Sequence, residues 1–203
     1  MTRSALVIGL GGTGQWVLSY LKKDLIESNN GEMPSNVRLL CFDTLPQAGA
    51  ELAAAATQKG EKEIKVGSVQ LEKNKEFVHL GGDVYELSRY VCEDSKRDKR
   101  EQNYTHISSW FQACHWLDNL PTGAFVLSSG AGQLRQFGRL ALFKDLISRN
   151  NSAIWVRLDN AIGELAPGLK GEERLEIIIV GSFAGGTGSG LFIDLALLAR
   201  HRA

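Results

Sequence analysis

Three segments of this chain pass from an apolar run through a cluster of small residues into a stretch with helical spacing. They are "ALVIGLGGTG" near the start, "FVLSSGAGQ" in the middle and "IIIVGSFAGGTGSG" near the end. Strands that alternate with helices form a parallel sheet with the helices on its faces. The sequence therefore predicts an α/β fold of three layers, a Rossmann-like parallel sheet with helices on both faces.

The first unit reads as strand, turn, helix, strand and helix. The first strand runs to Ile8, the turn continues through Gly14, and the second strand, "NVRLLCFD", ends at Asp43. The alanine-rich stretch "QAGAELAAAATQKG" is expected to form the second helix. The first helix is expected to bury an apolar face whose members are spaced three and four residues apart: Trp16, Val17, Tyr20, Leu21 and Leu25.

We expect one nucleotide-binding domain over residues 1–203, with an insertion at residues 61–120. The insertion has the composition for one or two short strands, two helical stretches and an exposed charged loop, "EDSKRDKREQN". After it, a short strand is expected to lead into the second small-residue cluster and then into an amphipathic helix. The stretch "SAIWVRLDNAIGELAPGLKGEER" reads as a connector, helical or extended.

Charge and cysteine content argue against several classes of protein. Lys plus Arg equals Asp plus Glu at 23 each, so no overall field draws the chain to nucleic acid or to an anionic membrane. No apolar stretch approaches the length of a membrane span. The cysteines Cys41, Cys92 and Cys114 are odd in number and contain no CxxC pair, which argues against a disulfide framework or a zinc site. The sequence therefore predicts a cytoplasmic protein with no nucleic-acid partner and no membrane insertion.

The small-residue clusters are candidates for binding an anion. In a parallel sheet they lie at the carboxyl ends of their strands, where ligands bind. Their glycines expose backbone N–H groups, and the N-terminus of the next helix adds unpaired donors and the positive end of its dipole. For "GLGGTG" alone, a phosphate role and a purely conformational role are equally open, and for "SSGAGQ" alone the conformational role is favoured. Three clusters at one edge of a sheet indicate a di- or triphosphate.

The third cluster, "AGGTGSG", is the most specific of the three. It has no lysine, so it is not a Walker A loop, and backbone amides with the Thr187 and Ser189 hydroxyls would have to hold the phosphates. It resembles the signature [SAG]-G-G-T-G-[SA]-G of the tubulin/FtsZ superfamily at every position. "GLGGTGQ" is similar to the first phosphate loop of that family, "FDTLPQA" to the second and "GAGQLRQFGR" to the third. Within the superfamily, the chain most resembles the divergent bacterial tubulin-like proteins.

The resemblance implies GTP or GDP as the ligand, Mg²⁺ as its companion, and self-association of the full-length protein into filaments. It assigns no catalytic residue and no metal ligand. Whether Arg139 reaches a phosphate or pairs with an acid stays open, and Asp194 is taken as structural. The residues that the resemblance assigns to nucleotide binding are Gly9, Gly11, Gly12, Thr13, Gly14, Gln15, Asp43, Gly130, Ala131, Gly132, Ala184, Gly185, Gly186, Thr187, Gly188, Ser189 and Gly190.

The chain also departs from the family. After "GR" it has "LALFKDL", where FtsZ proteins place an acid and an arginine that help to hold the nucleoside. The acidic loop of the family, which completes the active site of the next subunit, lies beyond the signature helix, and the chain ends at Ala203. In addition, "IIIV" reads as a strand buried on both faces, yet it would lie at an open sheet edge. We therefore expect the N-terminal part of a longer protein, truncated after the signature helix, that binds GTP and barely hydrolyses it. A naturally short member of the family is the alternative.

Two other functions fit parts of the sequence. A Rossmann-type dinucleotide-binding or adenylating enzyme fits "GLGGTG", with Asp43 as the ribose-binding acid, although Asp43 comes later than the usual spacing of about 20 residues. Such an enzyme has no need of "AGGTGSG". A non-catalytic scaffold with the tubulin fold is the third possibility. Replacing Gly186 with Ala is expected to abolish phosphate binding and to leave the fold intact, which would separate the scaffold from a nucleotide-binding protein.

Overall fold

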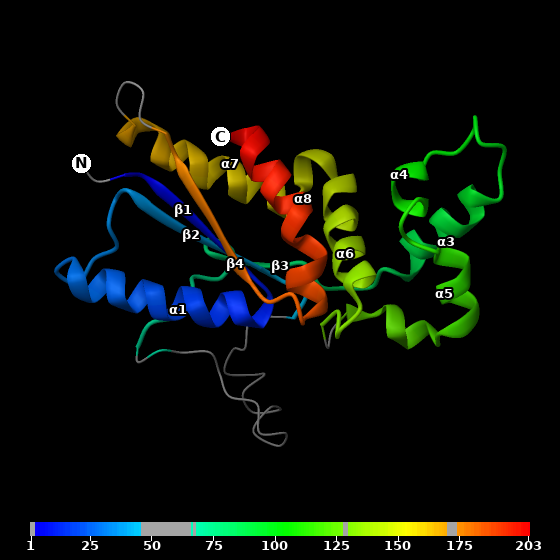
Figure 1. Ribbon diagram of the computed structural model, residues 1–203, viewed down its shortest axis with the longest axis horizontal. Helices are drawn as coiled ribbons and strands as arrows, with labels where there is room; N and C mark the ends of the chain where they lie inside the picture. Colours follow the sequence, from blue (N-terminus) through cyan, green and yellow to red (C-terminus); the bar gives the residue numbers. More distant parts are fainter. Residues whose placement is uncertain (1–2, 46–65, 67, 128–129, 170–173) are drawn as a thin grey trace, which may run out of the picture.

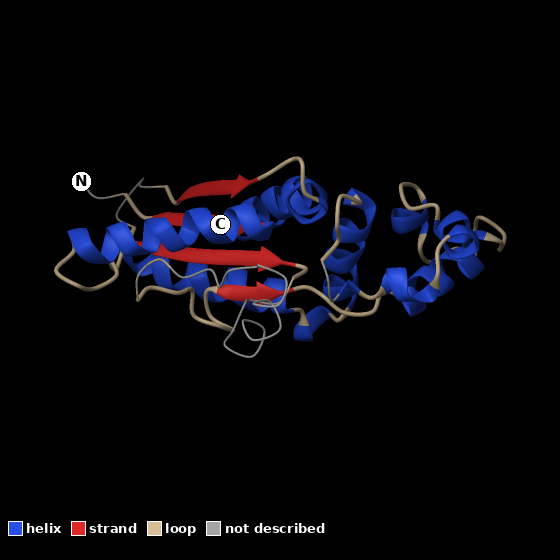
Figure 2. Cartoon of the chain, turned by 90° about the horizontal axis from the view of Figure 1, so that it is seen from below, coloured by secondary structure: helices blue, strands red, loops and turns tan. Residues whose placement is uncertain are grey.

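The computed structural model describes residues 3–45, 66, 68–127, 130–169 and 174–203. At its centre lies a parallel sheet with the strand order β3-β2-β1-β4 (Figures 1 and 2). The strands are β1 Ala5–Leu10, β2 Val37–Asp43, β3 Phe77–His79 and β4 Glu176–Gly181. The parallel α/β architecture predicted from the sequence is confirmed.

Helices cover both faces of the sheet. In Figure 1, α1 lies along one face and α7 and α8 lie along the other, with α6 beside α8. The helices that carry the site or the packing are α1 Gly11–Ser28, α6 Arg135–Ile147, α7 Ala153–Leu165 and α8 Gly186–Arg202. The stretch expected to be a connector, helical or extended, is therefore mostly the helix α7.

The alternation of side chains along each strand divides the core between the two faces. On β1, Leu6 and Ile8 belong to the larger core, which also contains side chains of α6, α7 and α8. Val7 points to the other face, where it joins Leu18 of α1 and Leu39 of β2. Both faces of the central strand are therefore buried, as a parallel sheet between two helical layers requires.

The predicted buried face of α1 is wrong for Trp16, Val17 and Tyr20, which are exposed, whereas Leu21 packs against the core. The helix begins at Gly11 and not after Gly14, and Trp16 and Tyr20 are 38% and 56% exposed. Its buried face is made largely of small and polar residues, because the helix approaches the sheet too closely for large side chains. A Cβ at Gly14 would lie 2.5 Å from the carbonyl carbon of Gly9. Lys22 is buried on this face because its ammonium group pairs with a buried carboxylate, that of Glu76.

The segment expected to be an insertion contributes both to the sheet and to a separate helical unit. Strand β3 joins the edge of the sheet beside β2. The helices α3 Tyr85–Ser95, α4 Thr105–Ser108 and α5 Ala113–Asn119 stand beyond α6, at the right of Figures 1 and 2. We call residues 85–119, which contain these three helices, the side module.

Of two further local predictions, one is wrong and the other lies outside the described residues. The short strand predicted before "SSGAGQ" is instead a 3-10 helix, Thr122–Phe125, followed by a single bridge between Val126 and Asp83. This segment leads out of the side module, and among the described residues it pairs with residues 82–84 and not with a strand of the sheet. The predicted helix "QAGAELAAAATQKG" and residues 128–129 lie outside the described residues.

The number and spacing of the cysteines argued against a disulfide framework, and this expectation is wrong. Cys92 of α3 and Cys114 of α5 form a disulfide with their Cα atoms 4.9 Å apart, whereas Cys41 is a buried free thiol in β2. The two half-cystines are 22 residues apart in sequence, and only the packing of α3 against α5 brings them together. Spacing along the chain carried no signal of that contact.

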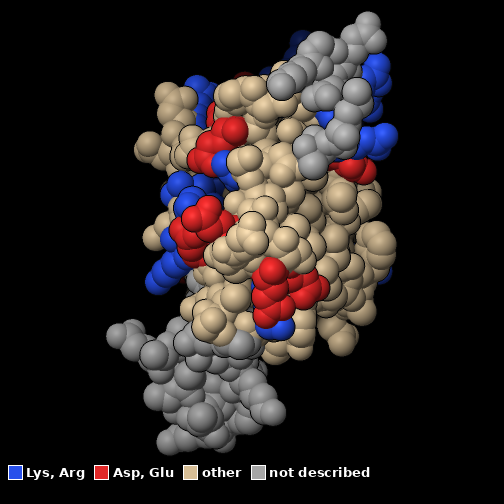
Figure 3. Space-filling model, turned by 90° about the vertical axis from the view of Figure 1, so that its left-hand side faces the viewer, with Lys and Arg blue, Asp and Glu red and all other residues tan. Residues whose placement is uncertain are grey.

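Strand β4 lies at the edge of the sheet and, within the described part of the chain, pairs only with β1. The apolar run "IIIV" thus lies at an open edge among the described strands, as expected from the sequence, and Ile178 is 42% exposed. No helix in the described ranges is both long and apolar enough to cross a membrane. On the face of the molecule shown in Figure 3, basic and acidic groups are interspersed.

Candidate phosphate-binding site

The carboxyl ends of β1, β2 and β4 meet at a cavity of about 190 Å³, which we call the central cavity. Segments from four parts of the chain line it, and they contribute backbone and small side chains almost throughout. The lining residues are Leu10, Gly11, Gly12, Thr13, Asp43, Leu45, Gly130, Ala131, Gly132, Ser182, Gly185, Gly186, Thr187 and Gly188.

Two helix N-termini open into this cavity. Helix α1 starts at Gly11 and α8 starts at Gly186, and a Cβ at Gly11 would lie 3.4 Å from the Cβ of Thr187. The first amides of a helix have no partner within it, and the aligned peptide dipoles place positive potential there. Two such ends side by side, wrapped in glycine, are suited to an anion with several oxygens.

The walls of the central cavity are held together by hydrogen bonds between loops. The hydroxyl oxygens of Thr44 and Thr187 lie 2.6 Å apart, and the Ala131 amide donates to Thr44 Oγ1 at 3.0 Å. The Gly186 amide donates to the carbonyl oxygen of Gly132 at 2.7 Å. The loops after β2 and β4 and the loop before α6 therefore form one connected wall, so the cavity is pre-formed.

Asp43 is the only ionisable residue that lines the central cavity within the described ranges. It ends β2 and is 2% exposed, its Oδ1 accepts the Leu45 amide at 3.1 Å, and its Oδ2 has no hydrogen-bond partner among the described residues. Burial raises the pKa of Asp43 above its ordinary value, against the lowering influence of the Leu45 amide and the Thr187 hydroxyl. A buried carboxylate oxygen without a partner beside a cavity is suited to a cation or a hydroxyl donor.

The structure brings together most of the residues proposed from the sequence. Eleven of them line the central cavity: Gly11, Gly12, Thr13, Asp43, Gly130, Ala131, Gly132, Gly185, Gly186, Thr187 and Gly188. The remaining six do not: Gly9, Gly14, Gln15, Ala184, Ser189 and Gly190.

The residues outside the lining have structural positions. Gly9 and Gly14 lie where β1 and α1 touch. The Ser189 hydroxyl donates to the Gly185 carbonyl oxygen at 2.5 Å, within its own helix. A Cβ at Gly190 would lie 2.5 Å from the carbonyl oxygen of Arg135, so this glycine permits α8 to touch α6. Four glycines in six residues thus serve two purposes, cavity lining and close helix packing.

Gly186 combines both purposes, which makes it a poor test of phosphate binding. A Cβ there would lie 2.6 Å from the carbonyl oxygen of Gly132 and 2.9 Å from that of Ala131. The expectation that Gly186→Ala would leave the fold intact is therefore not supported. Gly12 and Gly185 are better positions, because a Cβ at either would meet no protein atom within 4 Å.

Sequence reasoning missed Thr44, Ser182, Leu10 and Leu45. Thr44 is the most informative of them because its hydroxyl bridges Ala131 and Thr187, and its carbonyl oxygen lies 3.0 Å from His79 Nε2. Its one signal in the sequence is its place directly after Asp43 at a strand end. The others line the central cavity beside residues that the sequence did identify.

Arg139 pairs with an acid and does not line the central cavity. Its Nε and Nη2 lie 2.7 Å and 2.9 Å from the two carboxylate oxygens of Asp194, and its guanidinium lies 4.4 Å from the centre of the Trp110 ring. Of the two roles left open for Arg139, the structure shows the ion pair. Asp194 is accordingly a structural partner.

Comparison with known proteins gives one match. A family model described as "Tubulin like" matches residues 6–203, which include every element from β1 to α8. No curated protein and no solved structure matches the chain. Because the family model covers nearly the whole chain, including the strands and turns that build the central cavity, the chain belongs to the tubulin-like family.

Proposed function

We propose that the central cavity binds the phosphates of a guanine nucleotide, GTP or GDP. The observation that carries the proposal is the meeting of the α1 and α8 N-termini at one glycine-lined cavity. The described lining contains no Lys or Arg, so backbone amides and helix dipoles would supply the attraction for the anion. Membership of the tubulin-like family supports guanine as the base.

We further propose that Mg²⁺ accompanies the nucleotide. Mg²⁺ prefers oxygen ligands, keeps several waters and commonly takes one or two carboxylates together with phosphate oxygens. Asp43 fits this pattern, since its unpartnered Oδ2 lies at the central cavity. It would hold the ion directly or through a bound water, while the phosphates provide the other oxygens. The ion would neutralise phosphate charge and favour the ionised form of Asp43.

Turnover is proposed to be slow in this chain. In-line attack on a γ-phosphate requires a group that orients the water and groups that stabilise the transferring phosphoryl. Among the described lining residues, backbone amides could stabilise the phosphoryl group, and only Asp43 could orient the water. We also propose, on family grounds, filament formation by the full-length protein, a cytoplasmic location, and residues 61–120 as an insertion from which β3 joins the sheet.

The test is calorimetric titration of the purified chain with GTP, ATP and NAD, each with Mg²⁺. Saturable GTP binding is expected, and Gly12→Ala and Gly185→Ala are each expected to weaken it at least about tenfold, or about 1.4 kcal/mol. Both glycines line the central cavity, and a methyl group at either position would meet no protein atom within 4 Å. Gly163→Ala is the matched control, because Gly163 is exposed on α7 and a Cβ there also meets nothing within 4 Å.

Each other outcome has a definite meaning. Binding of NAD in place of GTP would identify the dinucleotide-binding alternative. No binding of any nucleotide by the folded chain would reject the proposal in favour of the scaffold. Equal losses in Gly12→Ala and Gly163→Ala would show that the nucleotide binds away from the central cavity.

A further inference from the structure

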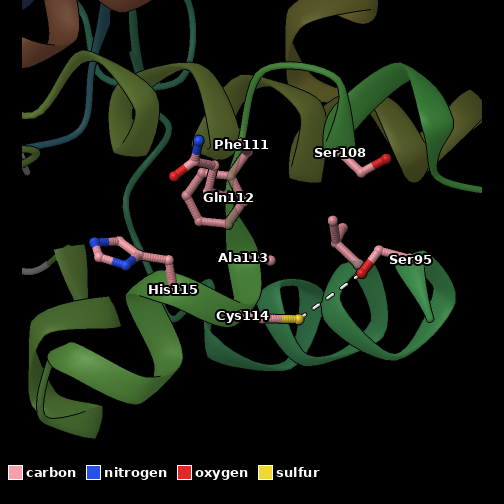
Figure 4. Close-up of a pocket in the computed structure, with 8 residues that line it drawn as sticks. Ser95, Ser108, Phe111, Gln112, Ala113, Cys114 and His115 are labelled. Atoms are coloured by element: carbon pink, nitrogen blue, oxygen red, sulfur yellow. Dashed lines mark hydrogen bonds between the residues drawn. The ribbon is translucent and has the colours of Figure 1, made fainter.

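One half of the disulfide of the side module, Cys114, lies at a second cavity, of about 270 Å³ (Figure 4). Cys114 lines this cavity together with Ser95 and Ser108, and its Sγ lies 3.8 Å from the Ser95 hydroxyl oxygen. Cys92 is buried and does not line it. A thiol that enters the cavity would therefore meet Cys114 Sγ first.

Helix α5 and the segment just before it dock on α6, and α3 packs on α5. The Phe111 and Trp116 rings pack against the Phe137 ring, with centroids 5.8 Å and 5.7 Å apart. Gln136 is bonded to the module twice. It accepts from Trp116 Nε1 at 2.7 Å and donates to the Trp110 carbonyl oxygen at 3.0 Å. The position of α6 thus depends on the position of the side module.

Helix α6 in turn touches α8 backbone to backbone where α8 lines the central cavity. A Cβ at Gly138 would collide with the Gly186 carbonyl oxygen, and the Gly186 amide bonds to Gly132, in the loop before α6. The Arg139–Asp194 ion pair fastens the same two helices about two turns further along α8. Close-packed contacts of this kind leave little room for one helix to move alone.

We propose that Cys92–Cys114 is a thiol-exchange site whose redox state sets the affinity of the central cavity for its nucleotide. The inference rests on the proposed function of that cavity. Opening the disulfide removes the covalent link between α3 and α5 and leaves only their packing, which loosens the support of α5 where it docks on α6 and then the contact between α6 and α8. In the proposed cytoplasmic setting a disulfide is exposed to thiol reductants, and cytosolic disulfides are mostly transient or redox-sensing.

The exchange needs only a dithiol as co-reactant. One thiolate of the dithiol attacks Cys114 Sγ, the sulfur–sulfur bond breaks, and Cys92 leaves as a thiolate that takes a proton from water. The second thiolate then attacks the mixed disulfide and releases Cys114, which is protonated likewise. The protein gains two electrons and two protons, and the dithiol leaves as a cyclic disulfide. Burial raises the pKa of the Cys41 thiol, so that cysteine stays inert.

The test compares the oxidised full chain with the same chain reduced by dithiothreitol. Calorimetric titration with GTP and Mg²⁺ is expected to show a Kd about fivefold or more higher after reduction. Without nucleotide, hydrogen exchange is expected to be faster in residues 186–189 of the reduced chain, since the Gly186 amide bonds to Gly132. The Cys92→Ser/Cys114→Ser variant retains Cys41. Its Kd for GTP and its hydrogen-exchange rates are expected to equal those of the reduced chain and not to change when dithiothreitol is added.

The two readouts separate the inference from the function on which it rests. If GTP binds equally in both redox states and residues 186–189 exchange at the same rate, the inference is overturned and the proposed function stands. If no nucleotide binds but exchange still responds to reduction, the proposed function fails and the coupling stands. If the double serine variant still responds to dithiothreitol, Cys41 is the responsive thiol and the inference is again overturned.

Discussion

At the level of single residues, glycines within one sequence motif have opposite structural roles. Gly185 lines open space, whereas Gly186, its neighbour, lies against the backbone of the loop before α6. The motif therefore lines the central cavity and makes a helix contact at once. A substitution in it tests binding only where the added methyl group meets no protein atom.

Gly186→Ala is expected to destabilise the fold by about 1–3 kcal/mol, because the Cβ would overpack against the carbonyl oxygens of Gly132 and Ala131. Urea unfolding of the variant measures the loss. Gly163→Ala in exposed α7 serves as the control and is expected to gain about 0.5–1 kcal/mol, since Ala forms helix better than Gly. If Gly186→Ala were as stable as the wild type, the loop before α6 would have moved to accept the methyl group without loss of stability.

Asp43→Asn is expected to stabilise the protein without ligand at neutral pH and to weaken its response to Mg²⁺. The folded-state pKa of Asp43 is raised by burial, so its protonated form favours folding and this contribution is lost as pH rises through the folded pKa. The advantage of the variant is therefore expected to be absent below about pH 3.9 and to grow above it.

Thermal unfolding of wild type and Asp43→Asn between pH 4 and 8 measures the difference in stability. GTP titration with and without Mg²⁺ measures how strongly nucleotide binding depends on the ion in each protein. A wild type that gains stability relative to Asp43→Asn as pH rises would contradict the burial argument. Equal Mg²⁺ dependence in the two proteins would remove Asp43 from the proposed ion site.

At the level of elements, a buried ion pair fastens α1 to the segment that leads into β3. Lys22 Nζ lies 2.6 Å from Glu76 Oε2 and donates to the Gln70 carbonyl oxygen at 3.0 Å. The same carboxylate oxygen accepts the Glu72 amide at 2.7 Å. Such pairs cost desolvation when formed, but removing one partner leaves the other charge buried.

Lys22→Met is expected to destabilise the fold by about 3–5 kcal/mol, and Lys22→Met/Glu76→Leu is expected to recover much of that loss. Lys23→Met is the matched control. Its exposed pair with Glu27, at 3.2 Å, is expected to contribute less than about 1 kcal/mol. Urea unfolding of all three variants provides the comparison, and a double variant as unstable as the single one would show that packing, not charge, decides this site.

The packing of α6 against α8 is the element contact on which the site depends most. These helices meet through Gly138, Gly186 and Gly190, and the Arg139–Asp194 pair closes the contact. The side module enters the same arrangement through Trp110, whose ring lies under the Arg139 guanidinium. The residues near the central cavity are therefore supported from outside the sheet as well as by it.

At the level of the whole molecule, ligand binding is expected to stabilise the fold without rapid turnover. GTP with Mg²⁺ at 100 times its Kd should add about 2.7 kcal/mol to the free energy of unfolding, because the unfolded chain has no cavity to bind it. In the same samples, phosphate release is expected to stay near the buffer background. Steady release by the purified chain would contradict the slow turnover proposed from the described lining.

Much of the architecture could be predicted because its signals are local. Apolar runs marked β1, β2 and β4, small residues followed two of them, β1 and β4, and the alternation of strands with helices implied a parallel sheet. The face of α1 and the short strand before "SSGAGQ" were wrong for a shared reason. Each depends on which other segment lies alongside, and neither hydrophobic spacing nor composition carries that information.

The sequence by itself determined the α/β class and the small-residue loops at the strand ends, because both follow from patterns within a few residues. Only the tertiary structure decided which glycines line the central cavity and which pack. It alone joined Thr44 to Thr187, 143 residues apart, and closed the Cys92–Cys114 disulfide. The physical reason is that helix packing sets these contacts, and packing depends on the shapes of surfaces that come together only in the folded chain.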